Sequence, residues 1–101
     1  MARVVAYVPD LMDRSRLAGV AFVATPAELV DTDADIVVVD LSRPGVLDVL
    51  PAVAERVPRV IGFGSHVDTE LLAAARAAGC TEVLPRSRFF ANPKAVLGPV
   101  L

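Results

Sequence analysis

The chain has a single cysteine, Cys80, and a single histidine, His66, among its 101 residues. One cysteine excludes an internal disulfide and any metal site built from several cysteines. No apolar run approaches the ~20 residues that a membrane-spanning helix needs. Ten basic and 12 acidic residues give a net charge of −2, so no excess of positive charge favours nucleic acid or an anionic membrane. We therefore expect neither nucleic acid nor a membrane as a partner.

Apolar residues are abundant. They make up 54% of the chain against 22% charged residues, which is far from the composition of a disordered protein. A chain of this length forms one compact domain and leaves no room for a second, so we predict a single domain over residues 1–101. The first residues enter a strand-like run directly and lack the pattern of a secretory signal, which predicts a cytoplasmic protein.

Five short β-rich segments recur along the chain, each followed by a helix-like segment. They are residues 3–8, 20–24, 35–40, 59–63 and 82–84. The segments are nearly continuous in apolar residues, which is typical of parallel strands covered by helices on both faces. We therefore predict a flavodoxin-like α/β/α sandwich of three layers, with a five-stranded parallel sheet in the order 2-1-3-4-5.

Side-chain oxygens mark the expected helix starts. Residues 25–28 (Thr-Pro-Ala-Glu) and residues 65–68 (Ser-His-Val-Asp) both have the form of a capping box. Asp48 is expected to cap a third helix, and Asn92, followed by proline, to open the last one. The helix after the second box has a predicted apolar face that ends at Gly79. That face consists of Val67, Leu71, Ala74, Ala75 and Ala78.

Ligands of this fold bind outside the carboxyl ends of the strands. The residues that directly follow the predicted strands are therefore the candidates for a functional site. They are Pro9, Asp10, Asp40, Gly64, Ser65, His66, Arg86 and Ser87.

The most informative of these segments is residues 35–45, where an apolar strand runs into Asp40 and Pro44-Gly45 follows four residues later. Together with residues 77–86, this segment resembles the receiver domain of bacterial response regulators, and the resemblance spans nearly the whole chain. In that family an aspartate at the end of the third strand accepts a phosphoryl group. The resemblance implies that Asp40 is the phospho-acceptor.

The match to the receiver site is partial. The family has an acidic pair after strand 1, a hydroxyl residue after strand 4 and a lysine after strand 5. These positions align with Pro9 and Asp10, with Gly64 and with Arg86. The first, second and fifth helices also look short. The chain therefore resembles a trimmed and degenerate receiver domain.

Two other residues lie next to the altered positions. Ser65 follows the hydroxyl position by one residue, and Ser87 replaces the proline that follows the family's lysine. The candidates for a switch or for anion binding are therefore Gly64, Ser65, His66, Arg86 and Ser87.

These departures have chemical consequences. Phosphoryl transfer to an aspartate relies on Mg²⁺ held by carboxylates, and the two carboxylates of Asp10 and Asp40 hold it more weakly than three. The planar fork of Arg86 suits a standing pair with a carboxylate. The strand ends are therefore expected to hold either weakly bound Mg²⁺ or an Asp40–Arg86 salt bridge. With no hydroxyl at Gly64, we favour a stand-alone signalling or protein-interaction module that is not a normal phospho-switch.

Two alternatives stay open. One is a working response regulator, phosphorylated on Asp40 by a histidine-kinase pathway. The other is a small anion- or nucleotide-binding domain, in which the amides of Ser65 and His66 receive a phosphate beside a nearby arginine. The arginines considered are Arg43, Arg86 and Arg88. An enzyme ranks below these, because no nucleophile and base are paired in the sequence.

Several residues also have purely structural interpretations. Asp10 fits the N-cap of a short first helix, with Asp13 adding favourable charge in its first turn. His66, in the first turn of a helix, is typical of a surface residue. Cys80 is typical of a small buried apolar residue.

The end of the chain suggests a partner. Phe89 and Phe90 are adjacent, so one faces the core while the other is exposed or at an interface. The last helix is short and is expected to stop at Pro99, which would leave apolar sheet surface in water at a cost of ~25 cal/mol per Å². We therefore expect a homodimer or another protein partner.

Overall fold

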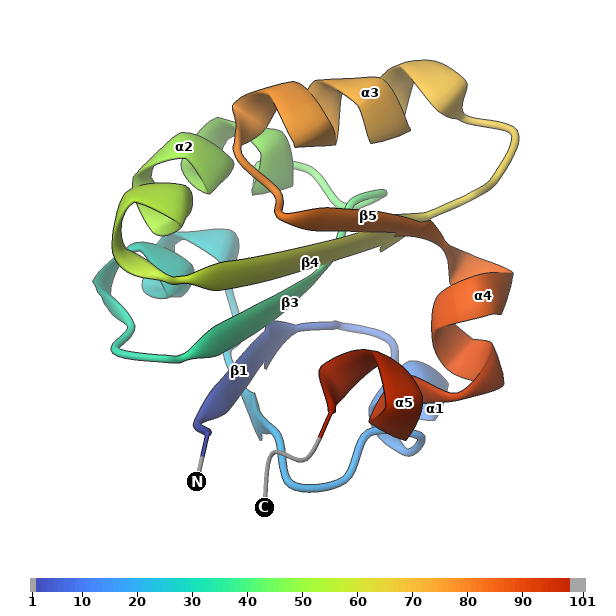
Figure 1. The fold of residues 1–101 in the computed structure, drawn as a ribbon. Helices are drawn as coiled ribbons and strands as arrows, with labels where there is room; N and C mark the ends of the chain where they lie inside the picture. Colours follow the sequence, from blue (N-terminus) through green and yellow to red (C-terminus); the bar gives the residue numbers. More distant parts are fainter. Residues whose placement is uncertain (1, 99–101) are drawn as a thin grey trace.

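The apolar segments of the sequence form a twisted parallel sheet at the centre of the molecule (Figure 1). The computed structural model describes residues 2–98. The strands lie in the order β2-β1-β3-β4-β5, and each neighbouring pair is parallel. They are β1 (Val4–Tyr7), β2 (Ala21–Phe22), β3 (Ile36–Asp40), β4 (Arg59–Gly64) and β5 (Glu82–Pro85). The predicted flavodoxin-like fold and its strand order are confirmed.

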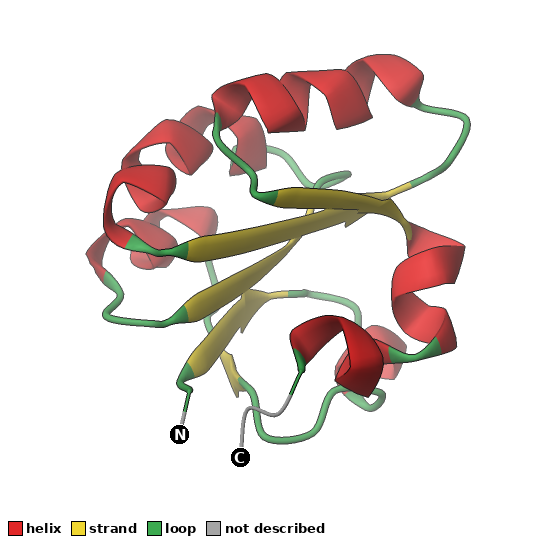
Figure 2. Ribbon diagram, in the orientation of Figure 1, coloured by secondary structure: helices red, strands yellow, loops and turns green. Residues whose placement is uncertain are grey.

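Helices cover both faces of this sheet (Figure 2). One face packs against η1 (Pro26–Asp31), α2 (Val46–Arg56) and α3 (Thr69–Ala78). The other packs against α4 (Arg86–Ala91), α5 (Pro93–Leu97) and the loop that follows α1 (Leu11–Arg14). The expected shortening is also confirmed, because α1 has four residues, α5 has five, and the second helix is a 3₁₀ helix of six.

Alternate residues of each strand belong to two separate cores. Val37 packs in the cluster that contains Leu50 of α2, whereas Val38 packs in the cluster that contains Phe89 and Leu97. Both valines are fully buried. Because the sheet has no solvent-facing side, its central strands carry no polar alternation.

Two of the predicted helix starts are wrong in detail. The Thr25 side chain makes no capping hydrogen bond. Instead, the Glu28 carboxylate accepts a hydrogen bond from the Ala24 amide at 3.0 Å, one residue before the expected position. Asp48 lies inside the first turn of α2, because Gly45 turns the chain with a φ of 84° and the helix begins directly after it.

The start of α3 is also displaced. Residues 65–68 form a turn, closed by the Asp68 amide donating to the Ser65 carbonyl at 3.1 Å. Asp68 then becomes the N-cap, and its carboxylate accepts from the Leu71 amide at 3.3 Å. Val67, which falls in this turn, is 74% exposed and does not belong to the apolar face. Asn92 caps α5 as predicted, accepting from the Ala95 amide at 3.2 Å.

The buried face of α3 is rotated relative to the prediction. Leu72 and Ala75 are buried and Leu71 is half-buried, whereas Ala74 is exposed. The later helix start removes Val67 from the helix, and the face that packs on the core is the one on which Leu72 and Ala75 lie three residues apart. Gly79 ends the helix as predicted.

The sheet face next to α5 is covered, although that helix is short. Phe63 and Phe89 are fully buried, and their stacked rings lie 5.1 Å apart between centroids. Arg59 ties α5 to the sheet, because its guanidinium donates to the Leu97 carbonyl at 3.2 Å and pairs with Glu82. The expectation of uncovered sheet surface is therefore wrong, and this reason for a homodimer does not hold. Pro99, the expected helix stop, lies outside the described residues.

No helix within residues 2–98 is long and apolar enough to cross a membrane.

Cys80 is buried, as its sequence context predicted. Its side chain is only 9% exposed, and burial raises the pKa of the thiol from 9.0 to about 11. Because the thiolate is the reactive species, we expect alkylation by iodoacetamide at pH 8 to be roughly 100-fold slower in the native protein than in urea. Mass spectrometry of timed samples measures this difference. Equal rates in the two states would contradict the burial of Cys80.

Candidate functional site

The residues predicted to form the site all lie at the carboxyl edge of the sheet. Asp10 follows β1, Asp40 ends β3, Ser65 follows β4 and Arg86 follows β5. The structure divides them into two groups. One is a cluster of carboxylates around β1 and β3, and the other is a pocket beside β4 and β5.

Asp40 is enclosed by its own loop. The carboxylate is only 3% exposed, although it stands at the end of its strand. Its Oδ1 accepts hydrogen bonds from the Ser42 amide at 3.0 Å and the Ser42 hydroxyl at 2.6 Å. Its Oδ2 accepts from the Arg43 guanidinium at 3.4 Å. Both carboxylate oxygens therefore accept hydrogen bonds from Ser42 or Arg43, which follow closely in the chain. Such local hydrogen bonds are common for aspartate in turns.

Arg86 forms its ion pair with Asp13, and the predicted Asp40–Arg86 salt bridge is wrong. The Nη2 of Arg86 lies 2.6 Å from the Oδ1 of Asp13, whose side chain is 6% exposed. The hydrogen bond to Asp13 raises the pKa of Arg86, and the charges of Asp13, Asp40 and Asp10 add to this effect. Asp40 therefore acts on Arg86 through its charge, without direct contact.

Asp13 lies at the carboxyl edge of the sheet but is not among the site residues predicted from the sequence. The sequence predicts for Asp13 only a favourable charge in the first turn of α1. Asp13 is the buried third residue of the four-residue α1, and it meets Arg86, which follows β5 as the first residue of α4. The one available signal was its position one helical turn after Asp10.

Asp10 is the N-cap of α1, as its structural interpretation predicted. Its Oδ1 accepts from the Met12 amide at 2.8 Å and the Asp13 amide at 3.1 Å. The bond from the Asp13 amide lowers the pKa of Asp10, as does the Met12 amide, and the positive charges of Arg86 and Arg43 lower it further. Asp10 therefore stays ionised beside the two guanidinium groups.

These carboxylates already have hydrogen-bond partners within the protein. Mg²⁺ needs a near-octahedral shell of oxygens, but Asp10, Asp13 and Asp40 each accept bonds from amides or a guanidinium. Within residues 2–98, no group of three or more His, Cys, Asp or Glu residues is placed to hold a metal ion. Weak binding of Mg²⁺ by Asp10 and Asp40 stays a prediction.

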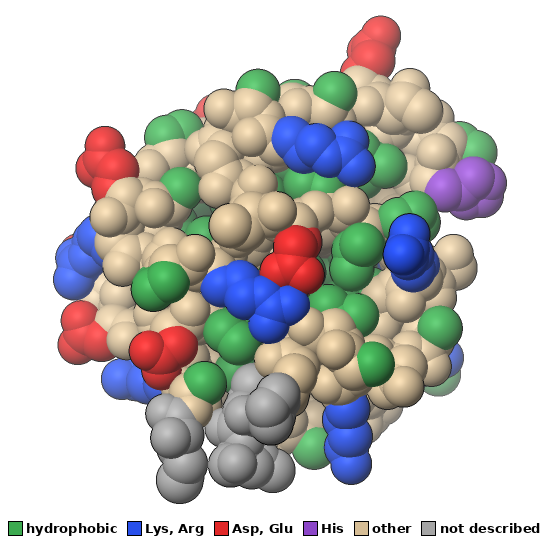
Figure 3. Space-filling model, viewed as in Figure 1, with side chains coloured by type: hydrophobic (Ala, Val, Ile, Leu, Met, Phe, Trp, Pro, Cys, Tyr) green, Lys and Arg blue, Asp and Glu red, His purple; other side chains and the backbone are tan. Residues whose placement is uncertain are grey.

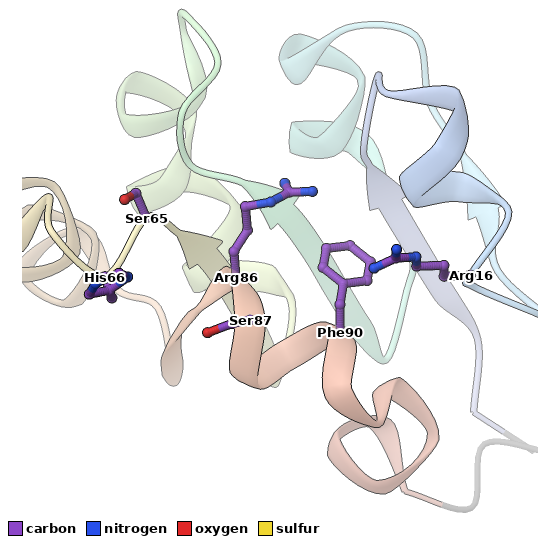
Figure 4. Close-up of a pocket in the computed structure, with 6 residues that line it drawn as sticks. All are labelled: Arg16, Ser65, His66, Arg86, Ser87 and Phe90. Atoms are coloured by element: carbon purple, nitrogen blue, oxygen red, sulfur yellow. The ribbon is translucent and has the colours of Figure 1, made fainter.

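The second group lines a pocket of about 280 Å³ (Figure 4). Four of the predicted switch or anion-binding residues line it, namely Ser65, His66, Arg86 and Ser87. Gly64, the fifth of them, is buried and does not line the pocket, and a Cβ added there would come 3.3 Å from the Leu72 side chain. The pocket is completed by Arg16 and Phe90, which the sequence had not connected to it.

The ring of Phe90 is flanked by two guanidinium groups. The guanidinium carbon of Arg16 lies 5.6 Å from the ring centroid and that of Arg86 lies 5.1 Å from it. Both distances are within the range of a cation–π interaction. Figure 4 shows the Arg16 side chain reaching from the loop after α1 toward this ring.

Charges of both signs are interspersed over the face drawn in Figure 3.

No protein-family model matches this chain, and no curated protein matches it. The resemblance to receiver domains therefore rests on the residues quoted above, and the fold is consistent with it.

Proposed function

We propose that the chain is a cytoplasmic, receiver-like module that binds a protein partner and does not depend on phosphorylation of Asp40. The observation that supports this proposal is that both carboxylate oxygens of Asp40 already accept hydrogen bonds within the chain. A phospho-acceptor must present a carboxylate oxygen to the phosphodonor, with Mg²⁺ nearby to neutralise charge. In this chain Ser42 and Arg43 already bond to the two oxygens of a buried carboxylate.

The second support is the apolar surface at the same edge of the sheet. Leu11 and Met12 follow β1 and are 76% and 74% exposed, and Val67 follows β4 and is 74% exposed. Apolar area in contact with water costs ~25 cal/mol per Å², so a partner that covers these side chains is stabilised by burying them. Arg43 and Arg86 lie at the same edge and supply polar contacts around such an interface.

Treatment with a small acyl phosphate and Mg²⁺, followed by intact-mass measurement, tests the proposal. We expect the wild-type protein to gain no phosphoryl group under conditions that phosphorylate an active receiver domain in the same tube. The Asp40→Asn variant is the matched control. A mass gain in the wild type that Asp40→Asn abolishes would overturn the proposal and favour the alternative of a response regulator phosphorylated through a histidine-kinase pathway.

A further inference from the structure

The pocket beside β4 and β5 is lined by positive and neutral side chains. Its lining includes Arg16, Arg86 and His66, together with two serine hydroxyls, and it includes no carboxylate. We propose that this pocket binds a small organic phosphate monoester, with the phosphate held by Arg16 and Arg86. The inference goes beyond the proposed function, because it does not depend on what happens at Asp40.

Arg16 is the residue that points most directly to an anion. Among the described residues, its side chain makes no ion pair or hydrogen bond, and its only specific contact is with the Phe90 ring. Its whole fork of N–H donors is therefore available, in the planar geometry that suits two phosphate oxygens.

Arg86 adds a second donor group on the same ring. Only its Nη2 is bonded to Asp13, so its other nitrogens keep their donors. Arg86 is already paired with Asp13, whereas Arg16 has no carboxylate partner among the described residues, so the charge of Arg16 is the one that an anion in the pocket would compensate. A phosphate monoester carries up to two negative charges and several acceptor oxygens, so it can accept hydrogen bonds from both guanidinium groups.

The serine hydroxyls offer donors to the organic part of the ligand, across the pocket from Arg16. Ser87 makes no side-chain hydrogen bond to another described residue. Ser65 uses its Oγ only to accept from the Val67 amide at 3.4 Å, so its O–H is available to donate. Figure 4 shows both serines at the pocket, on the side away from Arg16.

The size of the pocket limits the ligand. A volume of about 280 Å³ lies near the lower end of the range for small-ligand sites, so it suits a mononucleotide or a sugar phosphate better than a larger ligand. A mononucleotide and a sugar phosphate share the phosphate monoester group. Comparing each ester with the same molecule without its phosphate separates the contribution of the phosphate from that of the rest of the ligand.

Calorimetric titration with four probes tests this inference. The probes are AMP, ribose 5-phosphate, adenosine and ribose. We expect saturable binding of one or both phosphate esters and none of adenosine or ribose. Tighter binding of AMP than of ribose 5-phosphate would identify a nucleotide as the ligand, and the opposite order would identify a sugar phosphate. Binding of adenosine as tight as that of AMP, or no saturable binding of any probe, would overturn the inference.

A matched pair of variants locates the binding. Arg16→Gln should weaken binding at least ~10-fold, because it removes a charge-assisted contact, and it removes no ion pair among residues 2–98. Arg88→Gln makes the same charge change on α4, outside the pocket lining, and should bind as the wild type does. Equal weakening by both variants would contradict the assignment. Asp40→Asn should also bind normally, so this result is distinct from the outcome at Asp40.

Discussion

Replacing Gly79 with alanine is expected to lower the free energy of unfolding by about 3 kcal/mol. Gly79 ends α3 with a φ of 120°, a conformation that residues with a side chain rarely adopt. A Cβ at this position would also lie 2.6 Å from the Cβ of Ala54 in α2. Both atoms are fixed to the backbone, so the clash can be relieved only by moving the two helices apart.

Gly45 provides the matched control for this substitution. It has a φ of 84°, and a Cβ added there would lie 3.7 Å from the Cγ of Pro26, an ordinary van der Waals distance. Gly45→Ala should therefore show only the conformational cost, about 1 kcal/mol. Urea unfolding of the wild type and both variants measures the difference. Equal losses for the two variants would contradict the close approach of α2 and α3 at Gly79.

The second large effect is expected at the Asp13–Arg86 pair. Arg86→Met should lower the free energy of unfolding at pH 7 by about 2 kcal/mol, because it leaves the buried Asp13 carboxylate without its charged partner. The Arg86 side chain is 44% exposed, so water screens the pair and the loss is smaller than for a fully buried one. Arg88→Met, an exposed change in the same helix, should have little effect.

A double-mutant cycle separates the ion pair from general packing. The variant Asp13→Leu/Arg86→Met should recover most of the loss caused by Arg86→Met, because no uncompensated charge remains buried. Denaturant unfolding of the four proteins gives the coupling energy. Losses that simply add would show that Asp13 and Arg86 do not interact.

The fold was predictable because its signals are local. The unbroken apolar run of β3 identifies a strand buried on both faces. The alternation of strands and helices then leaves few arrangements for a parallel sheet. The extent of β2 was not predictable in the same way. It pairs only at Ala21 and Phe22, because it lies at the edge of the sheet and has β1 as its single neighbour.

The site was only partly predictable, because its contacts join distant parts of the chain. The sequence placed Asp40 and Arg86 at the same edge, but the choice of Asp13 as the partner of Arg86 depends on the length and direction of α1. The Arg16–Phe90 contact likewise joins two segments that no local pattern connects. In contrast, Ser65 and Ser87 line the pocket because they follow neighbouring strands, which the sequence does reveal.

The proposed function requires that the residues at the carboxyl edge of the sheet keep the same conformation when a phosphodonor is added. Two-dimensional amide NMR of the ¹⁵N-labelled protein, recorded before and after addition of Mg²⁺ and a small acyl phosphate, tests this claim most directly. We expect Ser42, Ser65 and Arg86 each to keep a single amide signal. The positions of these signals should change only slightly, and the changes should not saturate at a stoichiometric ratio of Mg²⁺ or acyl phosphate to protein. A second set of signals at all three residues, absent in Asp40→Asn, would reveal a phospho-switch and contradict the proposed function.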